Sequence, residues 1–341
     1  MNFKELNSVF IIAELSANHN GSIQTAVETI RAAKRAGANA IKLQTYRPDT
    51  ITLDSHQKDF LIDDNSIWRG QNLYDLYKKA YTPWEWHPKL FEVAKEEGLI
   101  IFSSPFDLTA VDFLEELNNP IYKIASFEIT DIPLIRYVAS KGKPIIISTG
   151  IATDKDIKLA LKACKDEGNK RVALLKCTSS YPAKIEEANL MMIKDFTRRY
   201  KVVSGLSDHT LGIVAPVVAV TQGAKIIEKH FILEKSIGGP DASFSLDEKE
   251  FGKMVEAVRE SELAIGKIDY SLSEKQKSAR NYSRSLYVSE DVKKGDIVTE
   301  SNIKSVRPGY GMHPKHLPNI LGKIFTKDCR IGTRVEEKLF K

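Results

Sequence analysis

The chain has 341 residues, of which 42% are hydrophobic and 28% are charged, and its net charge at pH 7 is +5. This balance is typical of a globular protein with a sizeable core, and the mild, scattered positive charge argues against nucleic-acid binding while allowing a local anion pocket. The three cysteines are odd in number and widely spaced, and the polar N-terminal residues run directly into an apolar stretch. We therefore expect a cytoplasmic protein with reduced thiols, no disulfide framework, no targeting segment and no membrane span.

Short apolar runs alternate with segments of helical periodicity between residues 9 and 266. The expected strands cover residues 9–13, 38–43, 99–102, 121–124, 144–147, 171–175, 201–206 and 224–227. The expected helices begin at or near residues 22, 83, 108, 132, 154, 188 and 213, with the last inside 244–266. Gly37 ends the first helix, and Thr153 with Asp156 forms a capping pair before another. Segment 45–71 has no expected helix or strand, and loops of this length often cover an active site.

Eight strands, each followed by a helix, predict a parallel arrangement. Their number and total length favour a closed eight-stranded βα (TIM) barrel, with a doubly wound open sheet as the alternative. In such a barrel the active site lies at the carboxyl ends of the strands. Each expected strand has a polar residue at or just beyond this end: Glu14, Lys42, Ser104, Lys123, Ser148, Lys176, His209 and His230.

The composition changes after Gly266, which suggests a domain boundary. Residues 267–283 are polar and charged and are interpreted as a linker or a solvated helix, so the barrel domain is expected over 1–266. Residues 284–341 contain short β-like runs separated by Gly, Pro and Asn turns. A domain of this size is marginally stable alone, so we expect it to pack on something else.

Two histidines stand out because each follows an expected strand. His209 lies in Ser207-Asp208-His209-Thr210 and His230 in Glu228-Lys229-His230. If the two strands are parallel neighbours, both imidazoles point into one space, as in a metal site with open positions for water and substrate. The alternative is that each His is a packed or surface residue. The cysteine and histidine spacings match no structural zinc motif.

Short motifs recur along nearly the whole chain. They are Ile12-Ala13-Glu14, Asn18-His19-Asn20-Gly21, Lys42-Leu43-Gln44-Thr45, Ser104-Pro105-Phe106, Tyr122-Lys123-Ile124-Ala125-Ser126, Ser148-Thr149-Gly150, Cys177-Thr178, Tyr181-Pro182, Gly205-Leu206-Ser207-Asp208-His209, Glu228-Lys229-His230-Phe231 and Ser305-Val306-Arg307-Pro308-Gly309. Each motif is weak alone, but taken together and in this order they resemble the sialic acid synthase family. The last motif belongs to a small C-terminal domain that resembles the antifreeze-like (SAF) type.

Within the family, the chain is most similar to the pseudaminic acid synthase branch. Leu43, Ser104 and Lys176 stand where the N-acetylneuraminate branch has His, Thr and His. The resemblance implies a metal-dependent transferase that condenses phosphoenolpyruvate with the open-chain aldehyde of 2,4-diacetamido-2,4,6-trideoxy-L-altrose. Water is added and phosphate leaves, giving a nine-carbon 2-keto acid. An N-acetylneuraminate or legionaminate synthase is the alternative within the family, and a non-catalytic sugar-binding barrel is the alternative outside it.

The resemblance also implies roles for individual residues. Those expected to bind phosphoenolpyruvate are Lys42, Ser104, Lys123, Ser126, Ser148 and Ser179. Those expected to take part in catalysis are Glu14, Glu128, His209 and His230, and those expected to bind the sugar are Gln44, Tyr181, Asp241 and Arg307. The alternative interpretation of the lysines is solvated charge, which is less favoured because both lie inside apolar strands.

Two further expectations concern the metal and the assembly. His209 and His230 would hold a divalent ion, with Mn²⁺ expected and Mg²⁺ or Co²⁺ as alternatives. Arg307 would reach the barrel of a second subunit, so the resemblance implies a domain-swapped homodimer. The alternative for Arg307 is an ordinary surface arginine.

Overall fold

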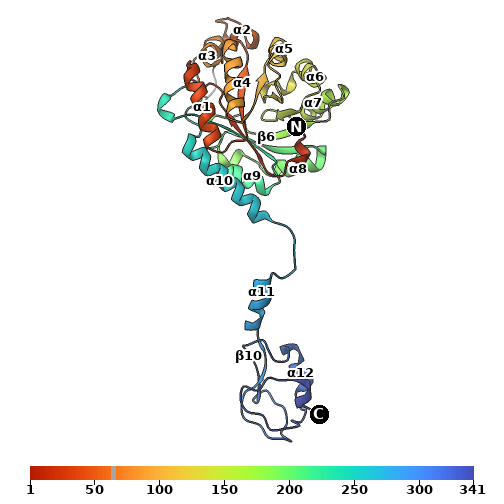
Figure 1. Cartoon of the computed structure of the whole chain (residues 1–341). Helices are drawn as coiled ribbons and strands as arrows, with labels where there is room; N and C mark the ends of the chain where they lie inside the picture. The colour runs from red at the N-terminus through yellow and green to blue at the C-terminus, as the bar shows by residue number, and fades with distance from the viewer. Residues whose placement is uncertain (63–66) are drawn as a thin grey trace. The chain divides into compact units, whose positions relative to one another are not determined.

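The structure is a computed structural model that describes residues 1–62 and 67–341. The chain forms two compact units, Met1–Gly266 and Lys267–Lys341. Figure 1 shows both units, with labels on some of their helices and strands. The segment expected to be a long loop, 45–71, lies partly outside the described residues. Its described part contains α2 (Pro48–Ile51) and the 3₁₀ helix η2 (Lys58–Phe60).

The first unit is a closed barrel of eight parallel strands in sequence order, as predicted. The strands are β1 (Phe10–Glu14), β2 (Ala40–Thr45), β3 (Ile100–Pro105), β4 (Tyr122–Ile124), β5 (Ile145–Ser148), β6 (Val172–Cys177), β7 (Val203–Asp208) and β8 (Ile226–His230). β8 pairs with β1 from Phe10 opposite Ile226 to Glu14 opposite His230. This pairing closes the sheet and excludes the doubly wound alternative.

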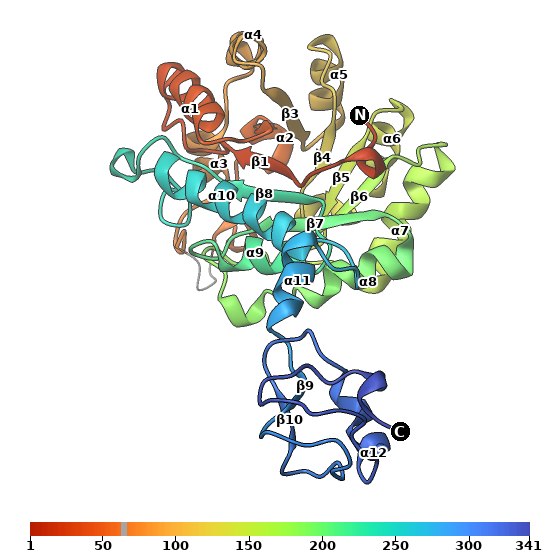
Figure 2. The same cartoon turned by 60° about the horizontal axis from the view of Figure 1, so that its bottom comes forward.

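Helices surround the barrel strands (Figure 2). They are α1 (Ile23–Arg35), α3 (Leu73–Ala80), α4 (His87–Glu96), α5 (Leu108–Glu116), α6 (Ile132–Ser140), α7 (Asp154–Asp166), α8 (Met191–Tyr200), α9 (Val214–Thr221) and α10 (Glu248–Ile265). The predicted Thr153 and Asp156 pair forms a complete capping box before α7. Helix α3 was not predicted, although Leu73, Leu76, Tyr77 and Ala80 fall at helical spacing; it is short and buries only Leu76.

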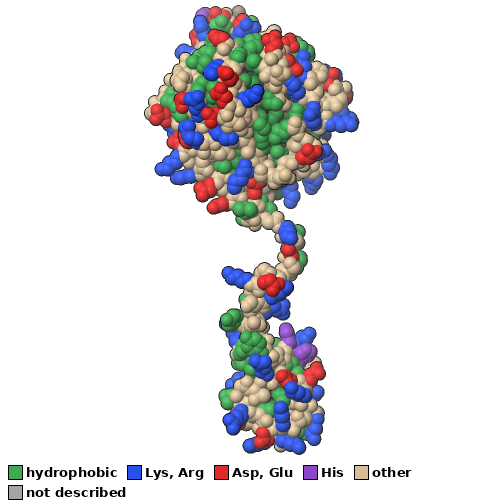
Figure 3. Space-filling view, viewed as in Figure 1, with side chains coloured by type: hydrophobic (Ala, Val, Ile, Leu, Met, Phe, Trp, Pro, Cys, Tyr) green, Lys and Arg blue, Asp and Glu red, His purple; other side chains and the backbone are tan. Residues whose placement is uncertain are grey.

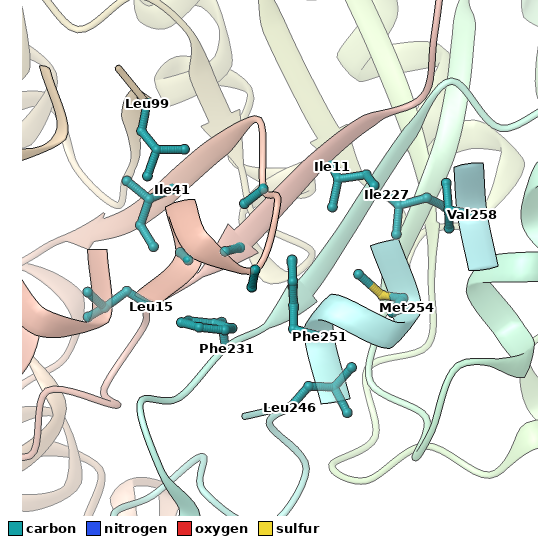
Figure 4. Close-up of a cluster of buried hydrophobic side chains, with 14 of the residues drawn as sticks. Ile11, Leu15, Ile41, Leu99, Ile227, Phe231, Leu246, Phe251, Met254 and Val258 are labelled. Carbon is teal, nitrogen blue, oxygen red and sulfur yellow. The ribbon is translucent and has the colours of Figure 1, made fainter. Parts of the chain in front are cut away.

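Alternation along the strands separates two apolar layers. Side chains on the outer face, such as Ile11, Ile41 and Ile227, pack against the helices that cover the barrel, including Phe251 and Met254 of α10 (Figure 4). Successive strand residues point to opposite faces, so their neighbours in the sequence point into the barrel. The outer layer fixes the register of each strand, because a slip of one residue would turn its outer apolar side chains into the barrel and its inner side chains outward.

The interior of the barrel is apolar at the amino ends of the strands. Phe3 of η1 (Phe3–Glu5) packs there with the inward-facing residues of the surrounding strands. These are Phe10, Ile12, Ala40, Phe102, Ile121, Ile146, Ala173, Leu175 and Ile226. With this end filled, inward-facing side chains beyond it toward the carboxyl ends can be polar.

The second unit is built around a pair of antiparallel strands, β9 (Ser285–Val288) and β10 (Ile303–Val306). It has its own buried cluster, which includes Leu286, Val298 and Phe325. The helices of this unit are α11 (Glu274–Ala279), η7 (Arg280–Tyr282), η8 (Pro314–His316), α12 (Leu317–Ile320) and η9 (Glu337–Leu339). An isolated bridge joins Ile297 to Ile324 in this unit.

The surface carries both signs of charge. Figure 3 shows Lys and Arg side chains interspersed with Asp and Glu over the visible face of the barrel unit. None of the helices within residues 1–62 and 67–341 combines the length and apolar character needed to cross a membrane.

The tight barrel interior leads to a prediction about Gly205 on β7. A Cβ atom there would lie 2.1 Å from the Ile226 carbonyl oxygen and 2.8 Å from Leu175 Cδ2. Gly205→Ala is therefore expected to lower the free energy of unfolding by about 1–3 kcal/mol through overpacking. Urea unfolding measures this change, and wild-type stability in the variant would contradict the packing.

The matched control is Gly252→Ala in α10. A Cβ atom there meets no heavy atom within 4 Å. Alanine in an open helical position is expected to raise the free energy of unfolding by about 0.5–1 kcal/mol, because it has less backbone freedom to lose on folding.

Candidate active site

A small cavity of about 50 Å³ opens at the carboxyl ends of the barrel strands. Most of its lining is polar and comes from seven of the eight strands or the residues just after them. The lining residues are Glu14, Lys42, Gln44, Lys123, Ala125, Ser126, Ser148, Cys177, Tyr181, Ser207, His209, Glu228 and His230. Inward-facing positions of different strands thus converge on one space.

Four charged side chains form a buried network of ion pairs at this cavity. Lys42 Nζ lies 2.9 Å from Glu14 Oε2 and 3.6 Å from Glu228 Oε1. Lys123 Nζ lies 3.0 Å from the same Glu228 oxygen. All four side chains are buried, so each charge depends on its neighbours in place of water. When all four groups are ionised, the two ammonium groups and the two carboxylates have no net charge together.

Burial and pairing act differently on the two carboxylates. Burial raises the pKa of Glu14 to about 7; Lys42 opposes this shift and Glu228 adds to it. Burial would also raise the pKa of Glu228, but Lys123 and Lys42 together lower it to about 2. The difference follows from geometry, because Glu228 lies between two lysines while Glu14 contacts one. Glu228 therefore stays ionised, whereas Glu14 can exchange a proton near neutral pH.

A group of hydroxyls surrounds Gly150, just beyond β5. The Gly150 N–H donates to Ser126 Oγ at 3.0 Å. A Cβ atom at Gly150 would lie 2.0 Å from Ser179 Oγ and 2.8 Å from Ser126 Oγ, so only glycine leaves this space open. The hydroxyls of Ser148 and Ser179 are buried and have no hydrogen-bond partner among the described residues. Ser148 lines the cavity, so its hydroxyl is free to donate to an anion there, whereas Ser179 lies beside Gly150 and is not among the lining residues.

The two histidine rings face each other, with centroids 5.2 Å apart. His209 Nδ1 lies 2.9 Å from the Thr178 carbonyl oxygen, which can only accept, so Nδ1 carries a proton. Burial would lower the pKa of His209, but Cys177 and the Thr178 carbonyl raise it, so Nε2 offers a lone pair once the ring has lost its second proton. His230 Nδ1 is buried without a hydrogen-bond partner in the described chain and lies 3.6 Å from Asp241 Oδ2. Burial and the positive groups nearby lower the pKa of His230 well below its usual value, so this ring is neutral.

This arrangement can be tested against the needs of a divalent metal ion. Within residues 1–62 and 67–341, no group of three or more His, Cys, Asp or Glu side chains is gathered into a complete metal site. Two imidazoles with available lone pairs nevertheless stand side by side, and one has a buried nitrogen without a partner. These residues fit an ion that takes two protein ligands and completes its coordination with water or substrate.

Three of the four residues predicted to bind the sugar lie in the barrel unit near the cavity, and the fourth lies in the second unit. Gln44 donates to Glu14 Oε1 and to Ser16 Oγ, both at 2.9 Å, and the Tyr181 ring lies 4.4 Å from that of His209. Asp241 is buried beside His230. Arg307 follows β10 in the second unit and is exposed.

Of the other predicted site residues, Ser104 Oγ lies 3.4 Å from Lys42 Nζ, within the barrel. Glu128 lies on η4 (Phe127–Thr130) and is not among the side chains that line the cavity. Lys176 is the polar residue predicted at the carboxyl end of the sixth strand. It donates to the Cys177 carbonyl at 2.6 Å and to Thr178 Oγ1 at 3.2 Å. It does not line the cavity either.

Apart from Ala125, three lining residues were given no role in the site by sequence reasoning: Glu228, Ser207 and Cys177. Ser207 Oγ donates to Glu228 Oε1 at 3.0 Å, and Cys177 Sγ lies 3.8 Å from His209 Nδ1. Burial alone would raise the pKa of Cys177, but His209 lowers it to about 7. Strand periodicity could have found the first two, because Glu228 and Ser207 each lie two residues before a site histidine and so share its face.

The barrel and its cavity define a class: a TIM-barrel enzyme whose strand ends gather buried lysines, serine hydroxyls and two histidines around one cavity. The sequence profile of the NeuB family matches residues 29–270, and that of the SAF domain matches residues 283–336. The chain belongs to the NeuB family, the family of sialic acid synthases.

Similarity to individual proteins covers the whole chain. The chain is 48% identical over 340 residues to a pseudaminic acid synthase of Campylobacter jejuni, and the match covers 100% of this chain and 99% of that protein. Identity to the pseudaminic acid synthase of Helicobacter pylori is also 48%, over 95% of each chain. A crystal structure of N-acetylneuraminic acid synthetase from Leptospira borgpetersenii is 32% identical, with a TM-score of 0.72 over 80% of this chain and 90% of that one.

The buried carboxyl of Glu128 leads to a prediction about pH. Burial raises its pKa from 4.5 to about 7, so the folded protein keeps this proton to a higher pH than the unfolded chain does. The stability that protonated Glu128 contributes is present below pH 4.5 and is lost as the pH rises through about 7. Glu128→Gln, which mimics the protonated form, is therefore expected to lose less stability across this window than the wild type.

Urea unfolding at pH values below and above this window measures the difference. The matched control is Glu186→Gln, which changes an exposed carboxylate and should keep the wild-type pH dependence. Identical pH profiles for Glu128→Gln and the wild type would contradict the shifted pKa.

Proposed function

We propose that this protein acts as a pseudaminic acid synthase. It condenses phosphoenolpyruvate with the open-chain aldehyde of 2,4-diacetamido-2,4,6-trideoxy-L-altrose, adds water and releases inorganic phosphate, giving a nine-carbon 2-keto acid. The observation that carries this proposal is the convergence of two buried lysines, free hydroxyls and two imidazoles at one end of the barrel. The full-length 48% identity to pseudaminic acid synthases supports the choice of sugar.

The lysines and hydroxyls suit phosphoenolpyruvate because this substrate carries a phosphate and a carboxylate on three carbons. Lys42 and Lys123 are assigned to its charge, with Ser104 beside Lys42. The hydroxyls of Ser126, Ser148 and Ser179 around Gly150 are assigned to anionic oxygens. Charge-assisted hydrogen bonds in a buried site are stronger than those in water, which favours tight binding of such an anion.

His209 and His230 are assigned to a divalent metal ion, Mn²⁺ in preference to Mg²⁺ or Co²⁺. A bound ion supplies Lewis-acid polarisation of the aldehyde oxygen. Two observations support this assignment: His230 is neutral, and His209 turns Nδ1 toward the Thr178 carbonyl, which leaves Nε2 for the ion. Burial would lower the pKa of His209 but Cys177 raises it, so ion binding would release the Nε2 proton.

Proton transfer is assigned to two glutamates whose pKa values are raised by burial to about 7, Glu14 and Glu128. A general acid or base works best when its pKa lies near the working pH. Gln44, Tyr181 and Asp241 are assigned to the sugar, because they contact Glu14, His209 and His230 respectively.

The proposal extends to the assembly and the compartment. Arg307 is assigned to the sugar in the barrel of a second copy, which makes the enzyme a domain-swapped homodimer. The small size of the second unit supports a partner for it, since its core consists of a single modest cluster. Three free, buried cysteines support work in a reducing compartment, and we assign the protein to the cytoplasm.

The first test is phosphate release from phosphoenolpyruvate with Mn²⁺, comparing 2,4-diacetamido-2,4,6-trideoxy-L-altrose with N-acetylmannosamine and the legionaminic acid precursor. We expect release with the altrose derivative and at most slow release with the other sugars. Release with another sugar alone would keep the chemistry and overturn the substrate. No release with any of them would favour a non-catalytic sugar-binding protein.

The second test concerns the proposed swap. Arg307→Ala is expected to lower kcat/KM for the sugar by about tenfold or more, the usual cost of losing a charged hydrogen bond. His230→Ala should be inactive. After subunit exchange between these two variants, random pairing gives one intact site in each mixed dimer, so activity should recover to about a quarter of wild type. No recovery after verified exchange would contradict the swap.

A further inference from the structure

A second buried ion pair lies on the outer face of the barrel, directly behind the two histidines. Lys229 Nζ contacts Asp208 Oδ2, and the two side chains are 0% and 1% exposed. Asp208 on β7 and Lys229 on β8 are register partners in the sheet. Each is also the sequence neighbour of a histidine, Asp208 of His209 and Lys229 of His230. The pair therefore spans the same two strands as the imidazoles, on the opposite face.

Both members of the pair also hold the backbone beyond β7. Asp208 Oδ1 accepts hydrogen bonds from Thr210 N at 2.9 Å and from Thr210 Oγ1 at 2.8 Å. Lys229 Nζ donates to the Thr210 carbonyl oxygen. The residues on both sides of His209 are thus bound to each other and to the residue that precedes His230. Rotation of the His209 backbone relative to β8 would break these contacts.

The surroundings of the pair make its presence informative. The outward-facing neighbours along the same strands are Leu206, Ile227 and Phe231, all part of the apolar layer between barrel and helices. Two hydrocarbon side chains at these positions would fill the layer without the cost of burying charge. Replacing a buried ion pair by apolar residues is often neutral or stabilising, so stability alone does not account for a pair here.

We propose that the Asp208 and Lys229 ion pair is a positioning device that sets the separation and orientation of His209 and His230 for metal binding. This inference rests on the proposed role of the two histidines as metal ligands. Neither Asp208 nor Lys229 lines the cavity. They act through the backbone, in the way that groups behind a metal ligand orient it.

The test compares Mn²⁺ affinity with stability, because a purely structural pair would change only the second. Lys229→Met leaves a buried carboxylate unpaired and should lower both stability and affinity. The double variant Asp208→Leu with Lys229→Met removes both charges, so it should regain stability over the single variant. Its Mn²⁺ affinity should nevertheless stay at least about tenfold below wild type, as for loss of groups that orient metal ligands.

Calorimetric titration with Mn²⁺ alone gives the affinity, and urea unfolding gives the stability. The matched control is Ile227→Val, which removes a methylene from the same layer and should lower stability while leaving Mn²⁺ affinity unchanged. Wild-type affinity in a folded double variant would overturn the positioning role.

Two further variants keep the outcomes distinct. If the double variant does not fold, Thr210→Val removes one hydrogen bond and no charge; several-fold weaker Mn²⁺ binding is expected, and unchanged binding would overturn the inference. His209→Ala and His230→Ala should abolish binding. Wild-type protein that binds no Mn²⁺, or histidine variants that still bind it, would overturn the metal assignment itself and this inference with it.

Discussion

The pairing of β8 with β1 is the constraint on which the site depends. It closes the barrel and sets His230 opposite Glu14, while β7 sets Asp208 opposite Lys229 on the other side of β8. Because strand side chains alternate, the inward positions converge on one cavity and the outward positions pack against the helices. A slip of one residue in a strand would move its polar side chains into the apolar outer layer, so core packing and site assembly are specified together.

Charge balance is the second constraint, because four ionisable groups are buried in a cavity with little solvent. Glu14 and Glu228 hold Lys42 and Lys123 in place, so the ammonium groups are already oriented when an anion arrives. In the proposed function, phosphoenolpyruvate would compete with these carboxylates for the lysines. Preorganised charges of this kind need little rearrangement during reaction, which is a main source of electrostatic catalysis.

Sequence reasoning succeeded where local and long-range preferences agree. Strands such as β1 and β8 are short apolar runs, and buried parallel strands require this composition. It failed where the local signal is weak, as in β10, whose Ile303 is buried while its neighbours are polar. Helix α3 was also missed, although its apolar residues have helical spacing. Glu228 was missed for another reason: its role comes from contacts with Lys42 and Lys123, which lie far away in the sequence.

The sequence by itself determined the barrel, the family and the kinds of groups available at the strand ends, because periodicity and motif order are local properties of the chain. Only the tertiary structure decided which of these groups share a cavity. Glu228 joins the two lysines, Glu128 and Lys176 stay outside the cavity lining, and Asp208 pairs with Lys229 behind the histidines. The physical reason is that register and closure, which depend on packing of the whole barrel, set the distances between residues of different strands.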